Sequence, residues 1–136
     1  MDTKLKAPRY CLQCDDGAIL EHGVRDITLT VHGVKYTVPG ISGWHCPKCG
    51  ECEFDPGEGK RHSAELDQMI RDRQAREIRA IRKKLGLKQS EAGALFGGGV
   101  SAFSEYERGK TQAHKSTLLL FRLLDTHPEL MRELTL

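Results

Sequence analysis

The sequence predicts an α+β fold, in which a small β-rich N-terminal domain precedes an all-α C-terminal domain. Glycines and prolines punctuate residues 1–58, and apolar residues alternate with polar ones between positions 27 and 32. From residue 63 onward, the apolar residues recur at helical spacing instead. We divide the chain into residues 1–72 and 73–136, whose net charges are −3 and +5. The basic second part is therefore the one suited to neutralise phosphates.

The composition excludes several classes of protein. The chain of 136 residues is 38% hydrophobic and 29% charged, which suits a soluble globular protein. No apolar run approaches the ~20 residues of a membrane span, and the N-terminus lacks the apolar segment of a secretory signal. Five cysteines without an export signal argue against a disulfide scaffold and for metal binding in a reducing compartment. We therefore expect a cytoplasmic protein with no membrane partner.

The first predicted element is a β-hairpin. Ile27, Leu29 and Val31 alternate with polar residues, as they do in a strand with one buried face. Gly33 marks a turn, and residues 34–38 read as the returning strand.

Two CxxC pairs enclose this hairpin and predict a metal site. A CxxC turn brings two thiolates to one side of a loop, and two such loops facing each other give the tetrahedral four-sulfur coordination of structural zinc. A domain of about 60 residues has little apolar core, so metal binding would supply much of its folding free energy. We therefore predict one structural Zn²⁺ per chain, bound by Cys11, Cys14, Cys46 and Cys49.

Other interpretations of these cysteines stay open. The same four thiolates can hold iron in a rubredoxin-like site, which would make the domain a redox or electron-transfer module. Ordinary buried cysteines are the structural alternative. A thioredoxin-like pair is excluded, because it needs a single CxxC within a βαβ pattern. His45 and Cys52 flank the second pair; we expect both to be bystanders, with a ligand swap to Cys52 as the alternative.

Helices are predicted from residue 63 onward. Ser63 is a candidate N-cap because acidic residues follow it, and Gly86 is a candidate helix end. Apolar residues fit helical spacing near Ile70 and again near Ile78 and Ile81. The sequence leaves open whether residues 63–85 form one continuous helix or contain a frayed link.

The C-terminal part predicts a helix-turn-helix. A helix of about eight residues from Gln89 is followed by a glycine-rich turn and a second helix at about residues 101–108, with Phe103 and Tyr106 facing inward. The second helix is the candidate reader of the DNA major groove, and Gln89 would meet a phosphate. The predicted DNA-binding residues are Gln89, Ser101, Ala102, Ser104, Glu105, Arg108 and Lys110. The basic cluster at residues 79–84 supports this interpretation, although a solvated helix face explains it equally well.

A leucine-rich segment predicts a partner chain. Residues 118–124 are apolar except for Arg122, whereas a helix packed on one side needs an apolar stripe only ~100° wide. A second copy would cover the remaining surface in a twofold-symmetric homodimer. The predicted interface consists of Leu118, Leu119, Leu120, Phe121, Leu123 and Leu124. The alternative is that the short helix at residues 128–134 covers this segment within the monomer.

The order of these features resembles the MqsA-type antitoxins, which combine a YgiT-type zinc finger with a phage-repressor-like helix-turn-helix. The resemblance covers nearly the whole chain, and its specific parts are FGGGVSAFSEYERG and the DTHPEL ending. It implies a homodimer joined through the C-terminal domains. It also implies a zinc domain that contacts a cognate ribonuclease toxin, and repression of the operon that encodes both proteins. A dimeric helix-turn-helix is expected to bind a palindromic operator, with one recognition helix in each half-site.

The chain departs from the family pattern at two base-reading positions. Ser101 stands where the family has Asn, and Glu105 stands where it has Arg. A glutamate can only accept a hydrogen bond, most naturally from cytosine N4, and it also adds negative charge near phosphates. The operator sequence is therefore open, and so is DNA binding itself.

The sequence thus predicts a zinc-containing repressor and antitoxin that is not an enzyme, because no nucleophile–base arrangement or pair of carboxylates stands out. The alternatives are a stand-alone regulator without a toxin partner and a regulator paired with another type of toxin.

Overall fold

The structure is a computed structural model in which residues 7–135 are described. The chain forms two compact units, the first ending at Leu66 and the second beginning at Asp67. Together they form an α+β fold, in which a small antiparallel sheet with a cysteine cluster is followed by helices. This confirms the predicted fold class.

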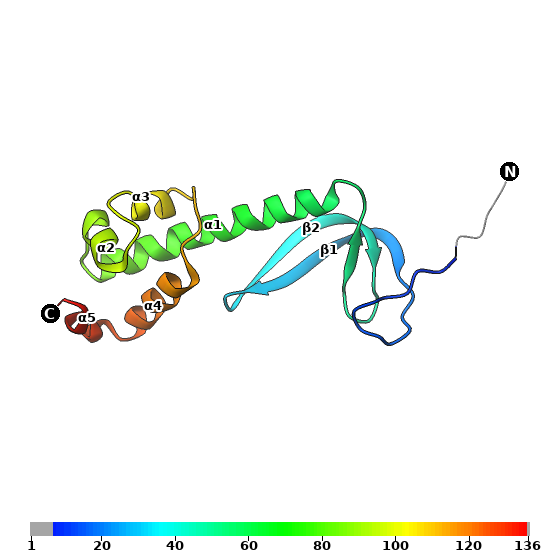
Figure 1. Cartoon of the computed structure of the whole chain (residues 1–136), viewed down its shortest axis with the longest axis horizontal. Coiled ribbons are helices and arrows are strands. Elements are labelled where there is room, and N and C mark those ends of the chain that lie inside the picture. The colour runs from blue at the N-terminus through cyan, green and yellow to red at the C-terminus, as the bar shows by residue number, and fades with distance from the viewer. Residues whose placement is uncertain (1–6, 136) are drawn as a thin grey trace. The chain divides into compact units, whose positions relative to one another are not determined.

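The N-terminal unit contains a three-stranded antiparallel sheet with the order β1-β2-β3, formed by β1 (Glu21–Val31), β2 (Val34–His45) and β3 (Cys52–Phe54) (Figure 1). The predicted hairpin is confirmed and is longer than expected. His32 and Gly33 form its two-residue turn with φ values of 48° and 81°. Positive φ at both positions is the signature of a type I′ turn, whose twist matches that of the strands.

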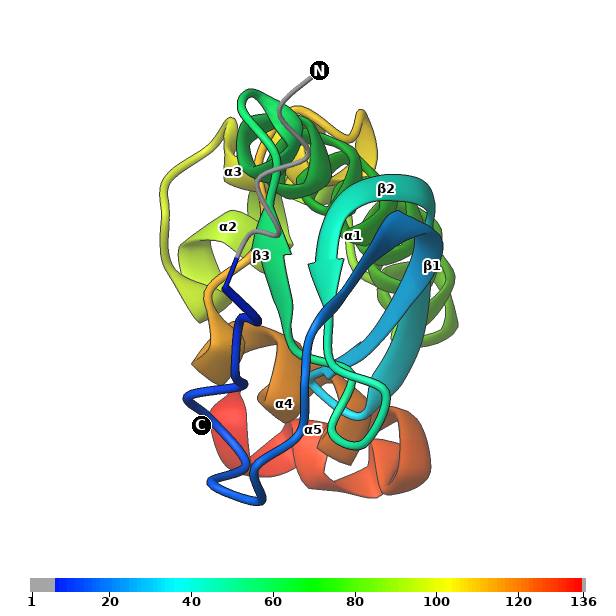
Figure 2. The same ribbon diagram turned by 90° about the vertical axis from the view of Figure 1, so that its right-hand side faces the viewer.

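An irregularity divides the long hairpin. The register between β1 and β2 shifts between Arg25 and Ile27, and the Asp26 carboxylate accepts a hydrogen bond from the Gly40 N–H at 2.9 Å. The two strands form a single twisted ribbon (Figure 2). Beyond the irregularity, pairing continues to Glu21 opposite His45. The open end of the hairpin therefore lies next to both CxxC loops.

Helix α1 (Glu58–Lys84) is continuous, which settles the question left open for residues 63–85. The predicted start at Ser63 was wrong, because the helix begins five residues earlier. Contacts with the sheet stabilise its first turn: the Ser42 N–H donates to the Glu58 carboxylate at 2.9 Å, and Arg61 donates to the Gly40 carbonyl. These contacts are distant in sequence, so local capping signals did not predict them.

The predicted helix end at Gly86 is confirmed. Gly86 has φ of 71°, its N–H bonds to the Lys83 carbonyl at 3.0 Å, and the Leu87 N–H bonds to the Arg82 carbonyl at 3.2 Å. This is a Schellman motif, in which a glycine in the left-handed conformation satisfies the last free carbonyls of a helix.

The second unit contains α2 (Gln89–Phe96), α3 (Ala102–Glu107), α4 (Lys115–Thr126), the 3₁₀ turn η1 (Pro128–Leu130) and α5 (Met131–Leu134). Within it, α3 and α4 flank the C-terminal half of α1 (Figure 1). Its hydrophobic core consists of Ile78, Ile81, Ala92, Ala102, Phe103, Ala113 and Phe121. Across the described residues, no helix has the length and apolar character that crossing a membrane requires.

Candidate metal centre and nucleic-acid interface

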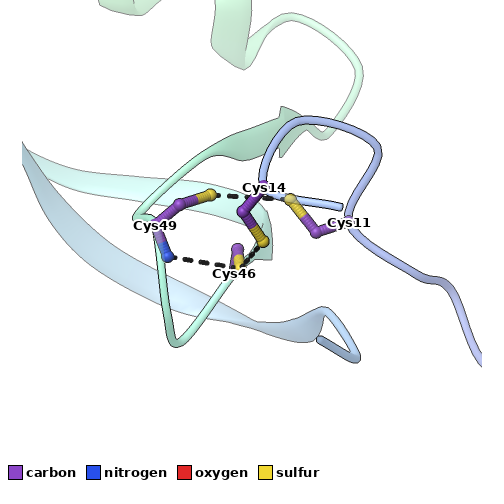
Figure 3. A group of neighbouring side chains, drawn as sticks. All are labelled: Cys11, Cys14, Cys46 and Cys49. Carbon is purple, nitrogen blue, oxygen red and sulfur yellow. Dashed lines mark hydrogen bonds between the residues drawn. The ribbon is translucent and has the colours of Figure 1, made fainter. Parts of the chain in front are cut away.

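Two backbone loops carry the four candidate ligands. Cys11 and Cys14 lie in the loop before β1, and Cys46 and Cys49 lie between β2 and β3. Hydrogen bonds from the Cys11 N–H to the Ala18 carbonyl (2.9 Å) and from the Cys46 N–H to the Glu51 carbonyl (2.8 Å) close the loops. The four side chains converge between them (Figure 3).

The sulfur positions fit a single metal ion. All four Sγ atoms lie within 4.8 Å of one another; the Cys11–Cys49 distance is 3.5 Å and the Cys14–Cys46 distance is 3.8 Å. A tetrahedral ion with metal–sulfur bonds of ~2.3 Å places its ligands about 3.8 Å apart. The four cysteines are therefore positioned to bind one metal ion, and a set of four soft sulfur donors suits zinc.

The surrounding backbone favours ionisation of one ligand. The Cys49 N–H donates to the Cys46 sulfur at 3.4 Å, and this bond, followed by other hydrogen bonds that include one from the Lys48 backbone, lowers the pKa of Cys46 to about 6. Burial acts in the opposite direction on Cys14 and raises the pKa of its thiol to about 12. Because a metal ligand must be deprotonated, binding at Cys14 displaces a proton at neutral pH.

His45 and Cys52 lie outside the four-sulfur group. His45 is only 3% exposed, and its Nε2 atom lies 3.0 Å from the Ile41 carbonyl oxygen. Cys52 begins β3, and its sulfur lies 3.9 Å from the same ring nitrogen. Burial raises the pKa of Cys52, which keeps this thiol protonated at neutral pH.

The sequence did not predict the polar network beside this site. The Arg9 guanidinium lies 4.7 Å from the centre of the Trp44 ring, which is a cation–π contact. The Asp55 carboxylate accepts a hydrogen bond from Ser42 (2.5 Å) and contacts His22 (2.8 Å), and these two interactions lower the pKa of Asp55. These residues come from four separate segments, so no spacing in the sequence could have indicated their proximity.

The predicted pair of short helices with a glycine turn is present. Helices α2 and α3 are joined through Gly97, Gly98 and Gly99, whose φ values lie between 83° and 94°. Gly93 allows α2 to approach this turn, because a Cβ atom there would lie 2.1 Å from the Gly99 carbonyl oxygen. The glycines therefore set the close packing of the turn against α2.

The predicted DNA-binding residues divide by exposure. Ala102 is only 7% exposed and packs in the core, so its predicted place on the outer face of the helix was wrong. Gly98 permits this close packing, because a Cβ atom there would lie 2.7 Å from the Cβ atom of Ala102. Phe103 and Tyr106 pack inward as predicted. The remaining candidates are exposed or half-buried: Gln89, Ser101, Ser104, Glu105, Arg108 and Lys110.

A buried ion pair that the sequence did not indicate holds α3 against α1. Arg82 donates two hydrogen bonds to the Glu107 carboxylate, at 2.7 and 2.8 Å, and a third to the Leu87 carbonyl at 2.8 Å. Gln74, which is 3% exposed, accepts the Ala113 N–H at 3.0 Å and fixes the segment after α3. The sequence alone places Arg82 in the basic cluster at residues 79–84, because a partner as distant in sequence as Glu107 leaves no local signal.

The residues of the predicted dimer interface also divide into buried and exposed ones. Leu118, Phe121 and Leu124 are at most 2% exposed inside their own unit, so placing them on a surface for a partner was wrong. They share one face of α4 at helical spacing. Leu119 and Leu123 point outward and are 47% and 49% exposed, and Leu120 is half-buried.

The segment at residues 128–134 covers this surface only in part. Leu120, Leu123 and Leu124 line a hollow of about 200 Å³ together with Leu130 and Leu134, and the last two remain 37% and 38% exposed. Leu119 and Leu123 of α4 therefore remain exposed within the described part of the chain.

Comparison with known proteins extends over nearly the whole chain. Residues 9–135 match the family model described as the antitoxin component of bacterial toxin-antitoxin system, MqsA. The chain is 39% identical over 129 residues to Antitoxin MqsA of Escherichia coli (strain K12), a match that covers 91% of this chain and 98% of that relative. Since both the cysteine cluster and the helix pair lie within the matched region, the chain belongs to the MqsA antitoxin family.

Proposed function

We propose that this protein is the cytoplasmic antitoxin of a type II toxin-antitoxin system and the repressor of its own operon. The domain at residues 1–72 binds and neutralises a ribonuclease toxin, and the domain at residues 73–136 dimerises and binds a palindromic operator. The main support is the match to Antitoxin MqsA, which covers 98% of that protein and 91% of this chain. The matched region includes residues of both units.

The proposed cofactor is one structural zinc ion per chain, held by Cys11, Cys14, Cys46 and Cys49. When bound, zinc joins the two loops at the open end of the hairpin and supplies folding free energy that a small apolar core cannot. The buried cluster around the ligands contains few other residues, namely Ala18 and Leu20, and Val38 and Ile41 are the large apolar side chains buried elsewhere in this unit. Zinc therefore acts by holding the toxin-binding domain folded and not by catalysis.

For DNA, α3 is the proposed groove reader, with Ser101, Glu105 and Arg108 on its accessible face. Gln89 at the first position of α2 can bring its amide and the free backbone N–H groups to a phosphate. Leu119 and Leu123 supply the contact that relates two such units by a twofold axis. A dimer would then place one recognition helix in each half-site.

Neutralisation of the toxin is the decisive test. The product of the neighbouring gene is expressed with and without the full chain, and growth and messenger RNA cleavage are measured. The chain is expected to restore growth and to form a complex with that product. If growth arrest persists when the full-length chain is present, and the chain still binds its promoter specifically, the protein is instead a regulator without a toxin partner.

A further inference from the structure

Helix α1 changes its charge pattern along its length. In its first part, charges of opposite sign are spaced three or four residues apart and form ion pairs. Arg61 pairs with Glu58 at 2.8 Å and with Glu65 at 3.0 Å, and Arg71 pairs with Asp67 at 2.9 Å. This alternation is typical of a helix face that only meets water.

The second part of the helix lacks this alternation. Residues 73–84 contain six cations and one acid, Glu77, which is paired with Arg122 at 2.6 Å. Two of the six cations are also paired: Arg82 with Glu107, and Lys84 with Asp125. The other four are exposed and have no side-chain partner among residues 7–135. We call these four the basic ridge: Arg73, Arg76, Arg79 and Lys83.

The helical period gathers the basic ridge on one side of α1. That side is opposite the buried side chains of Gln74, Ile78 and Ile81. At 1.5 Å per residue, the ridge extends over about 15 Å. The apolar residue on this side is Ala80, so the ridge has no large apolar side chain to form the centre of a protein interface.

This arrangement carries a local cost. Like charges three or four residues apart repel on a helix, as Arg73 and Arg76 do, and Arg76 and Arg79. The helix dipole favours cations in the last turn, which accounts for Lys83. It does not account for Arg73 or Arg76, which lie more than two turns before the end of the helix. A polyanion on the ridge would offset the repulsion.

We propose that the basic ridge binds the phosphate backbone of duplex DNA without regard to base sequence. The inference rests on the proposed DNA-binding function and adds a second contact surface to that of α3. Residues 73–136 contain 12 cations and 7 acids, and setting aside the three ion pairs of Arg82, Lys84 and Arg122 leaves nine and four. Since sequence-independent DNA affinity is electrostatic, unpaired cations gathered in a row on one surface supply more of it than cations scattered over the protein.

The test compares the full-length protein with two quadruple variants. The ridge variant is Arg73→Gln, Arg76→Gln, Arg79→Gln and Lys83→Gln. The control makes the same change in net charge at exposed cations elsewhere: Lys35→Gln, Lys60→Gln, Lys115→Gln and Arg132→Gln. The Kd is measured against salt concentration for the promoter duplex and for a random duplex.

Each phosphate contact contributes about 0.9 to the slope of log affinity against log salt. The ridge variant is therefore expected to lower that slope by about 2 to 4 on both duplexes. Its affinity for random duplex should fall at least ~10-fold at low salt, with the ratio of promoter to random affinity unchanged. The control should change both quantities much less. A melting temperature of the ridge variant at or above that of the parent confirms that it is folded.

An unchanged slope in the ridge variant overturns the inference, as does a change no larger than that of the control. Loss of toxin binding with intact DNA binding would make the ridge a protein surface and also overturns it. A different result would contradict the proposed repressor function alone: the parent protein would bind the random duplex as tightly as the promoter duplex. If the parent protein binds neither duplex at low salt, both the ridge inference and the proposed repressor function are overturned.

Discussion

Arg82 and Glu107 form a bidentate ion pair whose side chains are only 12% and 5% exposed, and this pair connects α1 to α3. Both charges have lost most of their hydration, so each depends on the other for compensation. The orientation of the proposed recognition helix therefore depends on a residue outside the helix pair itself.

Arg82→Ala should destabilise the protein by about 3 kcal/mol, because it leaves the Glu107 carboxylate buried without a partner. Urea denaturation followed by circular dichroism measures this change. Lys84→Ala is the matched control: its pair with Asp125 has exposed fractions of 52% and 46%, so the loss should stay below about 1 kcal/mol. Equal effects of the two substitutions would contradict the importance assigned to the buried pair.

The purified protein should contain one zinc ion per chain. Cys46→Ser should remove it and unfold the N-terminal unit, because the small core there cannot compensate. Cys52→Ser should retain the metal. Elemental analysis measures both, and a coloured, redox-active iron centre would refute the zinc assignment. Loss of metal in Cys52→Ser would show that the ligand set is different.

Leu123→Glu should convert a dimer into a monomer, because it places a charge on the exposed apolar surface of α4. Light scattering should report about twice the 15.2 kDa chain mass for the parent and about that mass for the variant. Leu12→Glu introduces the same charge at an 86% exposed residue of the other unit and should leave the dimer intact. A parent that is monomeric at micromolar concentration would disprove the interface.

Glu105→Ala tests the departure from the family pattern in α3. We expect this change to strengthen binding to any duplex, because it removes a negative charge near phosphates. If Glu105 instead accepts a hydrogen bond from a cytosine, the change should cost about 1–3 kcal/mol on the promoter alone. Gel shifts on promoter and random duplex separate these results. Glu133→Ala, an exposed acid in α5, controls for the change in net charge.

Spacing along the chain was enough to predict the local features. Two residues between the cysteines of each pair bring their sulfurs to one side of a loop, and the pairs at 11/14 and 46/49 do converge. Gly86 ends a helix because it adopts a positive φ at little cost. These features depend on residues that are neighbours in the sequence, so the sequence alone is enough to predict them.

Contacts between distant residues decided the rest. Helix α1 begins at Glu58 and not at Ser63, and its first turn bonds to the sheet through Glu58 and Arg61. Ala102 is buried and packs closely against Gly98. The sequence by itself determined the α+β order of elements, the four clustered cysteines and the pair of short helices. Only the tertiary structure decided which leucines of α4 stay exposed and which cations of α1 stay unpaired. The physical reason is that burial and ion pairing depend on partners such as Glu107 and Asp125, which approach α1 only when the chain folds.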